Sequence, residues 1–412
     1  MKNYKKLERC RICSNRNLKM ILDLGEQELT GVFPKSKENS ITSGPIQLVW
    51  CDNCGLLQLG HSYSLNEMYG ENYGYRSGLN QSMIKHLSDK VYHLERLYSL
   101  KTGDIVLDIG SNDATTLKSY TTSGLRKIGV DPTGEKFKHY YTSDIALISD
   151  FFSASNYKKI FKEEKAKIIT SIAMFYDLES PIDFVKDIES ILAEDGVWHF
   201  EQSYMPSMLR LISYDTICHE HLEYYSLSVI KFILDEADMK IIDVVMNSVN
   251  GGSFAVTAAK KLSSLEPNQP IIDWILEQEQ RMGINTIEPY RAFELKVMRH
   301  RQDLKRLINA LVQDGKKVLG YGASTKGNVL LQYCNFSNKE INAIVEVNPD
   351  KFGAYTPATH IPIISENKAK KENPDYYLIL PWHFKNGILD REQEFLSAGG
   401  KMIFPFPEIE IV

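Results

Sequence analysis

Short apolar segments alternate with helical patterns between residues 104 and 203 of the chain. The apolar segments read DIVLDIG, RKIGVD, IALIS, AKIITSIA and GVWHFEQS. Strands buried on both faces appear as nearly continuous apolar runs. Their alternation with helices predicts a parallel sheet covered by helices on both sides.

A second alternating set follows a long helical region that runs from PIIDWILEQEQ to HRQDLKRLINALVQDG. Its apolar segments read KKVLGYGAS, INAIVEV, YYLILPW and KMIFPFP. They predict a second, smaller parallel sheet in a domain of its own.

The first part of the chain has a different pattern. The apolar runs MILDLG and IQLVWC lie among turn-forming residues, which favours a small β-rich module. From residue 83 to residue 100 the apolar positions recur with a helical period. We therefore expect three domains: 1–75, 76–262 and 263–412.

Length and composition agree with this division. A chain of 412 residues exceeds the roughly 250–300 residues at which single cores stop growing. The hydrophobic fraction of 43% and the charged fraction of 25% are ordinary for a globular protein. The net charge of -5 is spread along the chain and gives no basic stripe, so nucleic acid is not an expected partner.

No targeting or membrane segment is evident in the sequence. The start MKNYKKLERC has no apolar run behind it, and no run approaches the roughly 18 apolar residues of a spanning helix. We expect a cytoplasmic protein without a membrane partner, and a monomer, with a dimer left open. In a reducing compartment the six cysteines are metal ligands or free thiols rather than disulfides.

Four cysteines form two CxxC pairs near the start of the chain, at Cys10 and Cys13 and at Cys51 and Cys54. Such paired spacing is typical of a structural Zn²⁺ site, in which four thiolates close the tetrahedron and leave no open position. Unrelated buried thiols or a redox pair are the alternatives. We expect the zinc ion to stabilise the module and not to catalyse.

The segment VLDIGSNDATTL places Asp108 at a strand end, then a turn at Gly110, then a helix beginning near Asp113. The next strand ends in Asp131, where a Rossmann-like sheet positions an acid to accept ribose hydroxyls. A dinucleotide site would require more glycines in this turn, and the carboxylate of Asp113 would repel the pyrophosphate of a dinucleotide. S-adenosylmethionine, with an adenosine and a cationic tail, fits better, although an incidental glycine turn is the alternative.

The strand end at Ser149–Phe152 could hold the adenine by stacking and by a carboxylate contact to its amino group. The expected cofactor contacts are Asp108, Gly110, Ser111, Asn112, Asp131, Pro132, Asp150, Phe151 and Met174.

Within the segment YDTICHEHLEYYSL, the six positions from Cys218 to Glu223 hold two histidines, two glutamates and a cysteine. If it is extended, His219 and His221 share a face and Glu220 points away. An imidazole tuned by a carboxylate could deprotonate a carbon next to a ketone before methyl transfer, or an alcohol. Packed structural histidines and a second metal held by Cys218, His219 and His221 are the alternatives.

Taken together, these motifs resemble those of the three-domain, S-adenosylmethionine-dependent sugar C-methyltransferases. The resemblance covers nearly the whole chain and rests on LDLGEQELTGVF, YGYRSG, LDIGSNDATTL, YDTICHEHLEYYSL, NGGSF, GYGASTKGNVLLQYC, NPDKFGAYTPATHIPI and GGKMIFPFPEIEIV. It implies an α/β protein with a small N-terminal zinc module, a central class I Rossmann-like methyltransferase domain and a smaller C-terminal Rossmann-like domain.

The resemblance also implies a substrate and a set of site residues. The substrate is an NDP-linked 4-keto-deoxy sugar, methylated at the carbon next to the ketone. His221 corresponds to the base and Glu220 to its assisting neighbour, with Tyr75 in the same site and His219 beside them. Substrate contacts are expected from Tyr73, Cys218, Tyr321, Lys326 and Asn328.

The loop GYGASTKGN follows a predicted strand and opens a helix. Its Gly320, Gly322 and Lys326 could meet a phosphate of the sugar nucleotide.

Two positions depart from the family pattern. Cys218 stands where tyrosine usually precedes the HEH motif, so a phenol that could bind the sugar or an oxyanion is absent. Ala114 stands where glycine is common, and a helical Ala114 would make this change small. The first departure keeps open an O- or N-methyltransferase, and a sugar-nucleotide-binding protein without catalysis is the non-enzymatic alternative.

Overall fold

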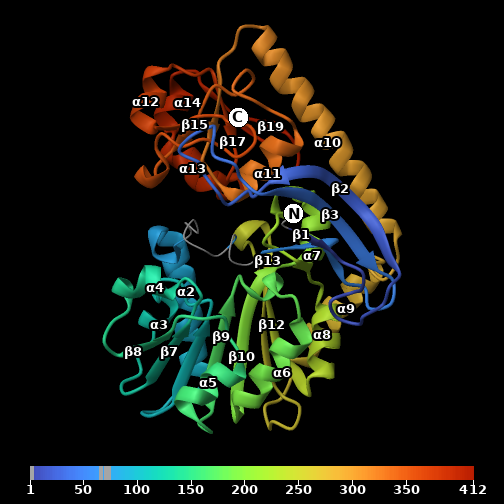
Figure 1. Ribbon diagram of the computed structural model, residues 1–412, viewed down its shortest axis with the longest axis vertical. Coiled ribbons are helices and arrows are strands. Elements are labelled where there is room, and N and C mark those ends of the chain that lie inside the picture. Colours follow the sequence, from blue (N-terminus) through green and yellow to red (C-terminus); the bar gives the residue numbers. More distant parts are fainter. Residues whose placement is uncertain (1–3, 65–67, 69–75) are drawn as a thin grey trace.

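The computed structural model describes residues 4–64, 68 and 76–412. The strands of these residues form sheets of four, seven and six strands and one two-stranded pair. In Figure 1 the seven-stranded sheet lies at one end of the molecule and the six-stranded sheet at the other, with the long N-terminal strands beside them. The predicted α/β fold, with a zinc module and two Rossmann-like domains, is confirmed.

The N-terminal module is built on an antiparallel sheet with the order β11-β4-β3-β2. The strands are β2 (Leu18–Glu28), β3 (Ser43–Cys51), β4 (Leu57–Leu59) and β11 (Glu223–Tyr224), while β1 (Tyr4–Lys6) pairs with β5 (His61–Tyr63). The strand β11 comes directly after the HEH motif in the chain. That motif is therefore attached to the N-terminal module, which the local sequence pattern did not predict.

The methyltransferase domain contains the seven-stranded sheet, with the order β12-β13-β10-β9-β6-β7-β8. Its strands are β6 (Ile105–Ile109), β7 (Arg126–Val130), β8 (Ile145–Ile148), β9 (Ala166–Ile172), β10 (Leu192–Ser203), β12 (Met239–Asn247) and β13 (Ser253–Lys260). The strands β6 to β10 are parallel, as their continuous apolar runs predicted, and β12 and β13 add an antiparallel edge.

The described part of this domain also contains helices. They are α2 (Gln81–Tyr98), α3 (Thr115–Lys118), α4 (Gly134–Phe137), α5 (Ala154–Phe161), α6 (Pro181–Ile191), α7 (Met205–Leu211) and α8 (Leu227–Glu236). Short 3₁₀ turns are η1 (Ser77–Leu79), η2 (Lys138–Tyr140), η3 (Phe175–Asp177), η4 (Tyr214–Thr216) and η5 (Val249–Gly251). The side chain of Asn80 caps α2 by accepting from the Ser82 amide.

The C-terminal domain is reached through α9 (Gln269–Arg281) and the 26-residue α10 (Glu288–Gln313), which runs along the outside of the molecule in Figure 1. Its sheet has the order β16-β15-β14-β17-β18-β19 and is parallel except at β19. The strands are β14 (Val318–Tyr321), β15 (Ile344–Glu346), β16 (Ile363–Ser365), β17 (Tyr376–Ile379), β18 (Lys401–Phe404) and β19 (Glu410–Ile411). The helices and turns are α11 (Thr325–Tyr333), η6 (Pro349–Lys351), α12 (Glu366–Lys371), η7 (Trp382–Phe384), α13 (Lys385–Arg391) and α14 (Gln393–Ser397).

The N-terminal module packs against both other domains. Trp50 of β3 contacts Tyr290 of α10, with 5.4 Å between the ring centroids. Cys51 and Leu56 belong to the same apolar cluster as Val229 of the methyltransferase domain. The module therefore holds the two larger domains in a fixed relation.

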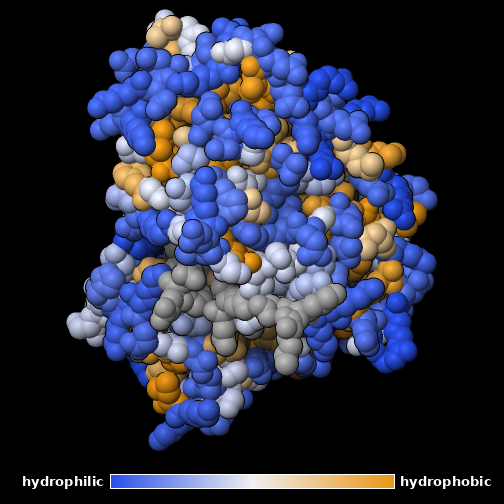
Figure 2. Space-filling model, turned by 45° about the horizontal axis from the view of Figure 1, so that its top comes forward, coloured by the Kyte–Doolittle hydropathy of each residue, from blue (hydrophilic) through white to orange (hydrophobic). Residues whose placement is uncertain are grey.

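One face of the molecule can be judged by the hydropathy of its residues. In Figure 2 the visible face is mostly hydrophilic, with apolar residues in separate small groups. None of the described helices is both long and apolar enough to cross a membrane.

Candidate active site

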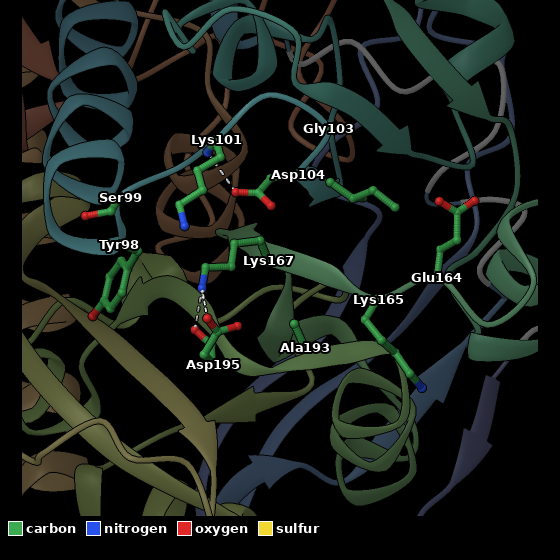
Figure 3. A pocket seen from close by; sticks show the side chains of 11 residues that line it. Tyr98, Ser99, Lys101, Gly103, Asp104, Glu164, Lys165, Lys167, Ala193 and Asp195 are labelled. Carbon is green, nitrogen blue, oxygen red and sulfur yellow. Dashed lines mark hydrogen bonds and ion pairs between the residues drawn. The ribbon is translucent and has the colours of Figure 1, made fainter.

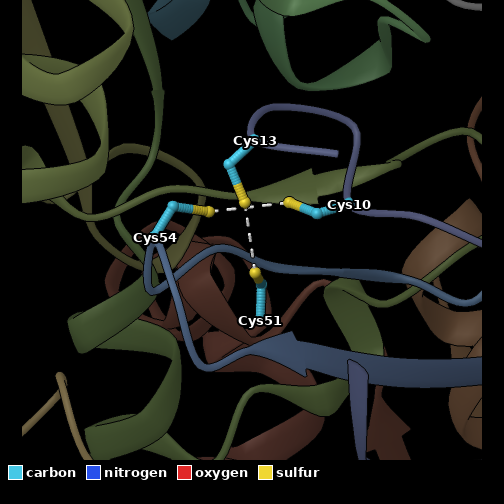
Figure 4. Close-up of side chains that lie close together, drawn as sticks. All are labelled: Cys10, Cys13, Cys51 and Cys54. Atoms are coloured by element: carbon cyan, nitrogen blue, oxygen red, sulfur yellow. Dashed lines mark hydrogen bonds between the residues drawn. The ribbon is translucent and has the colours of Figure 1, made fainter. Parts of the chain in front are cut away.

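The four cysteines of the N-terminal module turn their thiols toward one point (Figure 4). The Sγ atoms of Cys10 and Cys54 lie 3.5 Å apart, as do those of Cys13 and Cys51, and all four lie within 4.8 Å of one another. A tetrahedral zinc with Zn–S bonds of about 2.3 Å separates its sulfurs by about 3.8 Å. The residues therefore fit Zn²⁺, and four thiolates leave no position open for substrate.

Asp108 and Asp131 lie at the carboxyl ends of the adjacent strands β6 and β7. The Asn112 amide donates to Asp131 Oδ2 at 2.8 Å, which ties the turn after β6 to the second acid. Gly110 has φ +75°, and a Cβ there would lie 3.1 Å from Met174 Cγ. Backbone and side chains thus form a narrow cradle at the edge of the sheet where Rossmann-like folds bind ligands.

The helix after this turn begins at Thr115 rather than near Asp113. Ala114 has φ 60° and lies in the left-handed region, so the condition under which alanine would be a small change, a helical Ala114, is not met. A side chain in this conformation costs roughly 1–2 kcal/mol, which explains why glycine is common at this position in the family. The Asp113 carboxylate accepts from the Gly78 amide at 3.0 Å and lies 3.6 Å from Arg76 Nε, so it already has a cationic partner within the chain.

The remaining expected cofactor contacts lie along the same edge. Phe151 follows β8 and is 42% exposed, so its ring is available to an adenine. The Asp150 carboxylate accepts from Asn156 Nδ2 at 2.8 Å, and Ser111 Oγ is hydrogen-bonded to Tyr141 at 2.7 Å. Pro132 is half-buried beside Asp131. Strand-end carboxylates, a glycine cradle and an exposed ring on one edge fit S-adenosylmethionine.

The HEH motif is a turn and not an extended strand, so His219 and His221 do not share a face. The His221 amide bonds to the Cys218 carbonyl at 3.2 Å, closing the turn. The His219 ring is buried in the N-terminal module, edge-on to Tyr63 at 4.6 Å between centroids, and burial lowers its pKa to about 4. The two rings lie in different surroundings, so a metal shared by Cys218, His219 and His221 has no ligand set.

His221 faces the methyltransferase domain instead. Its Nδ1 lies 2.9 Å from the Thr216 carbonyl oxygen. Its ring contacts Tyr176 edge-on at 4.3 Å, and both line a cavity of about 10 Å³, room for about one water, that reaches Ser203 at the end of β10. Burial lowers the pKa of His221 to about 4, and the charge of Lys326 acts in the same direction.

Glu220 lies where the three domains meet. Its Oε1 would be 2.8 Å from a Cβ on Gly31 of the N-terminal module, and Thr325 Oγ1 of the C-terminal domain would be 3.9 Å from the same atom. Burial raises the pKa of the Glu220 carboxyl. The group that orients the His221 ring is therefore the Thr216 carbonyl, and Glu220 lies on the other side of the turn.

Cys218 is 1% exposed and packs in the apolar cluster that contains Met205 and Met208. Burial raises the pKa of its thiol well above the ordinary value, and the Glu220 carboxylate acts in the same direction. It is a neutral core side chain in this structure and faces no open space.

The expected substrate contacts are divided among different surroundings. The Tyr321 hydroxyl donates to Glu392 at 2.8 Å, and Asn328 Nδ2 donates to the Thr30 carbonyl at 2.7 Å, so both already have partners within the chain. Lys326 is half-buried, and its Nζ donates to the Asn250 carbonyl at 2.8 Å. Tyr73 and Tyr75 lie outside the described residues.

Asp215 and Trp382 were not predicted to belong to this site. Asp215 is 1% exposed, and its Oδ2 accepts from Trp382 Nε1 at 2.8 Å. Asp215 belongs to the motif YDTICHEH, where a charged residue among apolar neighbours was the available signal. Nothing in the local sequence identifies Trp382 as its partner.

A larger pocket of about 480 Å³ lies elsewhere (Figure 3). It is lined by residues at the amino ends of β6 and β9, among them Ile105 and Lys167, and Lys167 Nζ pairs with Asp195 at 2.5 Å. Ligands of such sheets bind at the carboxyl ends of the strands. This pocket is therefore at the wrong edge for the cofactor.

Comparisons with known proteins agree with this geometry. Residues 10–69 match a family described as a putative zinc binding domain, residues 81–244 a methyltransferase domain, and residues 248–407 a C-methyltransferase C-terminal domain. The chain is 30% identical over 409 residues to the C-methyltransferase NovU of Streptomyces niveus, covering 98% of this chain and 97% of that protein.

Among solved structures, an S-adenosylmethionine-dependent methyltransferase from Clostridium acetobutylicum is 14% identical, over 43% of this chain and 92% of that chain, with a TM-score of 0.35. The magnesium protoporphyrin IX methyltransferase of Synechocystis with bound S-adenosylmethionine is 12% identical, over 44% of this chain and 79% of that chain, with a TM-score of 0.32.

Proposed function

The chain belongs to the three-domain, S-adenosylmethionine-dependent C-methyltransferases, and from this premise we propose that it methylates the carbon next to the ketone of an NDP-linked 4-keto-deoxy sugar. His221 is the base in this proposal. When bound, S-adenosylmethionine supplies an electrophilic methyl group. Gly110, Asp131 and the residues along the same edge would hold this cofactor.

One observation carries the proposal most directly. The Thr216 carbonyl accepts a hydrogen bond from His221, so the hydrogen of the neutral ring is on Nδ1 and the lone pair is on Nε2. A base must lie within reach of the proton that it removes and must be unprotonated at the working pH. The tautomer and the lowered pKa of His221 meet the second condition.

The position of His221 supports the first condition. Its ring contacts Tyr176, which follows Met174 in the same short loop after β9, and Met174 packs against Gly110 of the cofactor cradle. Base and cofactor therefore adjoin the same edge of the sheet. A substrate carbon between them could lose its proton to His221 and receive the methyl group.

The C-terminal domain contributes the opposite wall. The amino end of α11 brings Thr325 near Gly31 and Glu220, and burial raises the pKa of the Glu220 carboxyl, which shifts it toward its protonated form. A neutral carboxyl can donate a hydrogen bond to a sugar oxygen. A cytoplasmic location and a monomeric chain, with a dimer as the alternative, are further parts of this proposal.

The experiment is methyl transfer from S-adenosylmethionine labelled with ¹³C in its methyl group. The acceptors are dTDP- and UDP-linked 4-keto-deoxy sugars, with the corresponding 4-hydroxy sugars as matched controls. We expect a new carbon-bound methyl signal by NMR with the keto sugars and none with the controls. An oxygen-bound methyl group, or equal transfer to the controls, would show that the proposed enolate chemistry is wrong.

A further inference from the structure

Lys326 lies at the point where two domains meet beside the base. It is in the first turn of α11, and its Nζ donates to the Asn250 carbonyl in η5 of the methyltransferase domain. Asn250 has φ 55°, and Gly251 has φ +90° with a would-be Cβ only 3.0 Å from Trp382. The NGGSF motif thus forms a turn whose Asn250 carbonyl accepts from the ammonium group and whose Gly251 leaves room for the Trp382 ring.

The charge of Lys326 interacts with titratable groups on several neighbouring elements. They are Asp215 in η4, Cys218 and His221 in the turn that follows, and His383 in η7. Burial lowers the pKa of Lys326 and raises that of Asp215, while each stabilises the charge of the other. The ammonium group donates its hydrogen bond to the Asn250 carbonyl, and the charge of Asp215 acts on it in addition.

The same turn connects Lys326 to the base. Asp215 directly precedes Thr216, whose carbonyl holds the His221 ring. The charge of Lys326 lowers the pKa of His221 as well as that of His383. A chain of contacts also joins cation and base. Lys326 bonds to Asn250, the neighbouring Gly251 packs against Trp382, and Trp382 bonds to Asp215 beside Thr216.

The chemistry requires such a cation. An imidazole with a pKa of about 4 is a weak base, so most of the cost of removing a carbon-bound proton must be met by stabilising the charge that develops on the ketone oxygen. The family's usual tyrosine before HEH is Cys218 here, and this thiol is buried and neutral. An ammonium group carries three N–H donors, of which the Asn250 carbonyl takes one.

We propose that Lys326 is a further catalytic residue, whose ammonium group polarises the substrate ketone and holds the enolate oxygen formed when His221 removes the neighbouring proton. This inference rests on the proposed function. The C–H bond breaks and the proton goes to His221 Nε2. The electron pair of the broken bond forms the C=C bond of the enolate, and the pair of the former C=O bond leaves the negative charge on the oxygen beside Lys326. No oxidant or reductant is needed.

The test compares Lys326→Gln with the unchanged enzyme in D₂O, without methyl donor, and follows deuterium entry at the carbon next to the ketone of a dTDP-linked 4-keto-deoxy sugar. We expect the exchange rate to fall roughly 100- to 1,000-fold, as when one oxyanion donor is lost, with KM changed far less. Lys167→Gln is the matched control, because Lys167 is also a half-buried lysine whose ammonium group donates to a backbone carbonyl, that of Asp195, at the opposite edge of the sheet. Unchanged exchange in Lys326→Gln, or a raised KM with an unchanged maximal rate, would overturn the proposal, and the raised KM would point to a phosphate contact.

Two pH readouts separate this role from a structural one. Loss of the charge in Lys326→Gln should move the acid limb of the exchange rate from about pH 4 toward the ordinary histidine value. In the unchanged enzyme the rate should fall as pH rises through the pKa of Lys326, which burial places below its ordinary value. Lys326→Arg should keep the exchange and lose that alkaline limb. The guanidinium group of arginine has a pKa above about 12, so it stays charged over the whole pH range of the experiment.

Lys326→Arg also serves if the glutamine variant does not fold. An alkaline limb that is the same in Lys326→Arg and the unchanged enzyme would overturn the proposal. If the unchanged enzyme exchanges no proton of any 4-keto sugar, both the proposed function and this inference are wrong. If it exchanges and Lys326→Gln does so equally, the inference alone is wrong.

Discussion

The Nδ1 atom of His221 lies 2.9 Å from the carbonyl oxygen of Thr216. Because a carbonyl only accepts, this contact assigns the ring hydrogen to Nδ1 and leaves Nε2 as the basic atom. The contact is made within one turn of chain, between η4 and the HEH motif. The tautomer of His221, the proposed base, is therefore set by backbone geometry and not by a neighbouring carboxylate.

The pH dependence follows from this arrangement. His221 acts as a base only when it is unprotonated, so activity is lost as pH falls through its pKa. Burial lowers that pKa to about 4, and the rate of proton exchange should rise with pH around 4 and be level near neutrality. A pH–rate profile with S-adenosylmethionine omitted measures this, and an acid limb near the ordinary histidine value would contradict the burial argument.

Gly31→Ala should disturb Glu220 without unfolding the chain. The added Cβ would lie 2.8 Å from Glu220 Oε1, which is closer than real Cβ contacts, and the half-buried carboxyl must shift. Misplacement of about 1 Å at a catalytic site can cost up to roughly 100-fold in rate, so we expect methyl transfer to fall by about 10- to 100-fold.

The matched control for Gly31→Ala is Gly387→Ala in α13, where nothing lies within 4 Å of the added atom. It should leave the rate unchanged and raise the free energy of unfolding by about 0.5–1 kcal/mol, because alanine favours a helix. Equal rates in the two variants would show that the position of Glu220 is unimportant.

Cys218→Tyr should not restore the phenol that the family usually has. Cys218 is 1% exposed among Met205, Met208 and their neighbours, so the larger side chain has no room. Overpacking of this kind costs about 1–3 kcal/mol, and thermal or denaturant unfolding should show the loss, with methyl transfer reduced. Cys218→Ala, which removes only the sulfur, should cost about 1 kcal/mol. A Cys218→Tyr protein that is as stable as the unchanged enzyme and more active would contradict this account.

Replacement of zinc should show that the metal is structural. The four thiols leave no open position, so Co²⁺ in place of Zn²⁺ should give the absorption of a tetrahedral thiolate site while methyl transfer is retained. Removal of the metal should unfold the module that pairs β4 with β11 and thereby release the HEH turn. Retained activity without any metal, or a changed product with Co²⁺, would contradict this role.

Local sequence patterns predicted the parts of the site that local structure determines. Cys10 and Cys54 belong to CxxC pairs, and Asp108 and Asp131 follow apolar strands, so their positions could be inferred from spacing. The turn at His219 and His221 could not be inferred in this way. The motif becomes a turn where the chain leads into β11, which pairs with β4, so the two histidines do not share the face that an extended segment would give them. Pairing with a distant strand outweighed the local pattern.

Contacts between domains were also beyond the reach of sequence patterns. Lys326 and Asn250 are 76 residues apart, and Trp382 and Asp215 are 167 residues apart. Lys326 was expected at a phosphate because its loop has a glycine-rich pattern. In the structure its ammonium group donates to the Asn250 carbonyl of the methyltransferase domain, a contact that depends on how the two larger domains dock.

The most direct test of the account is deuterium exchange into an NDP-linked 4-keto-deoxy sugar by His221→Asn and by the unchanged enzyme, both without methyl donor. Binding of S-adenosylmethionine, followed by calorimetry, and the unfolding temperature confirm that the variant is intact. We predict exchange at the carbon next to the ketone with the unchanged enzyme and its loss, by roughly 100- to 10,000-fold, with His221→Asn. Exchange retained at the same rate in a folded, cofactor-binding His221→Asn protein would contradict the assignment of His221 as the base.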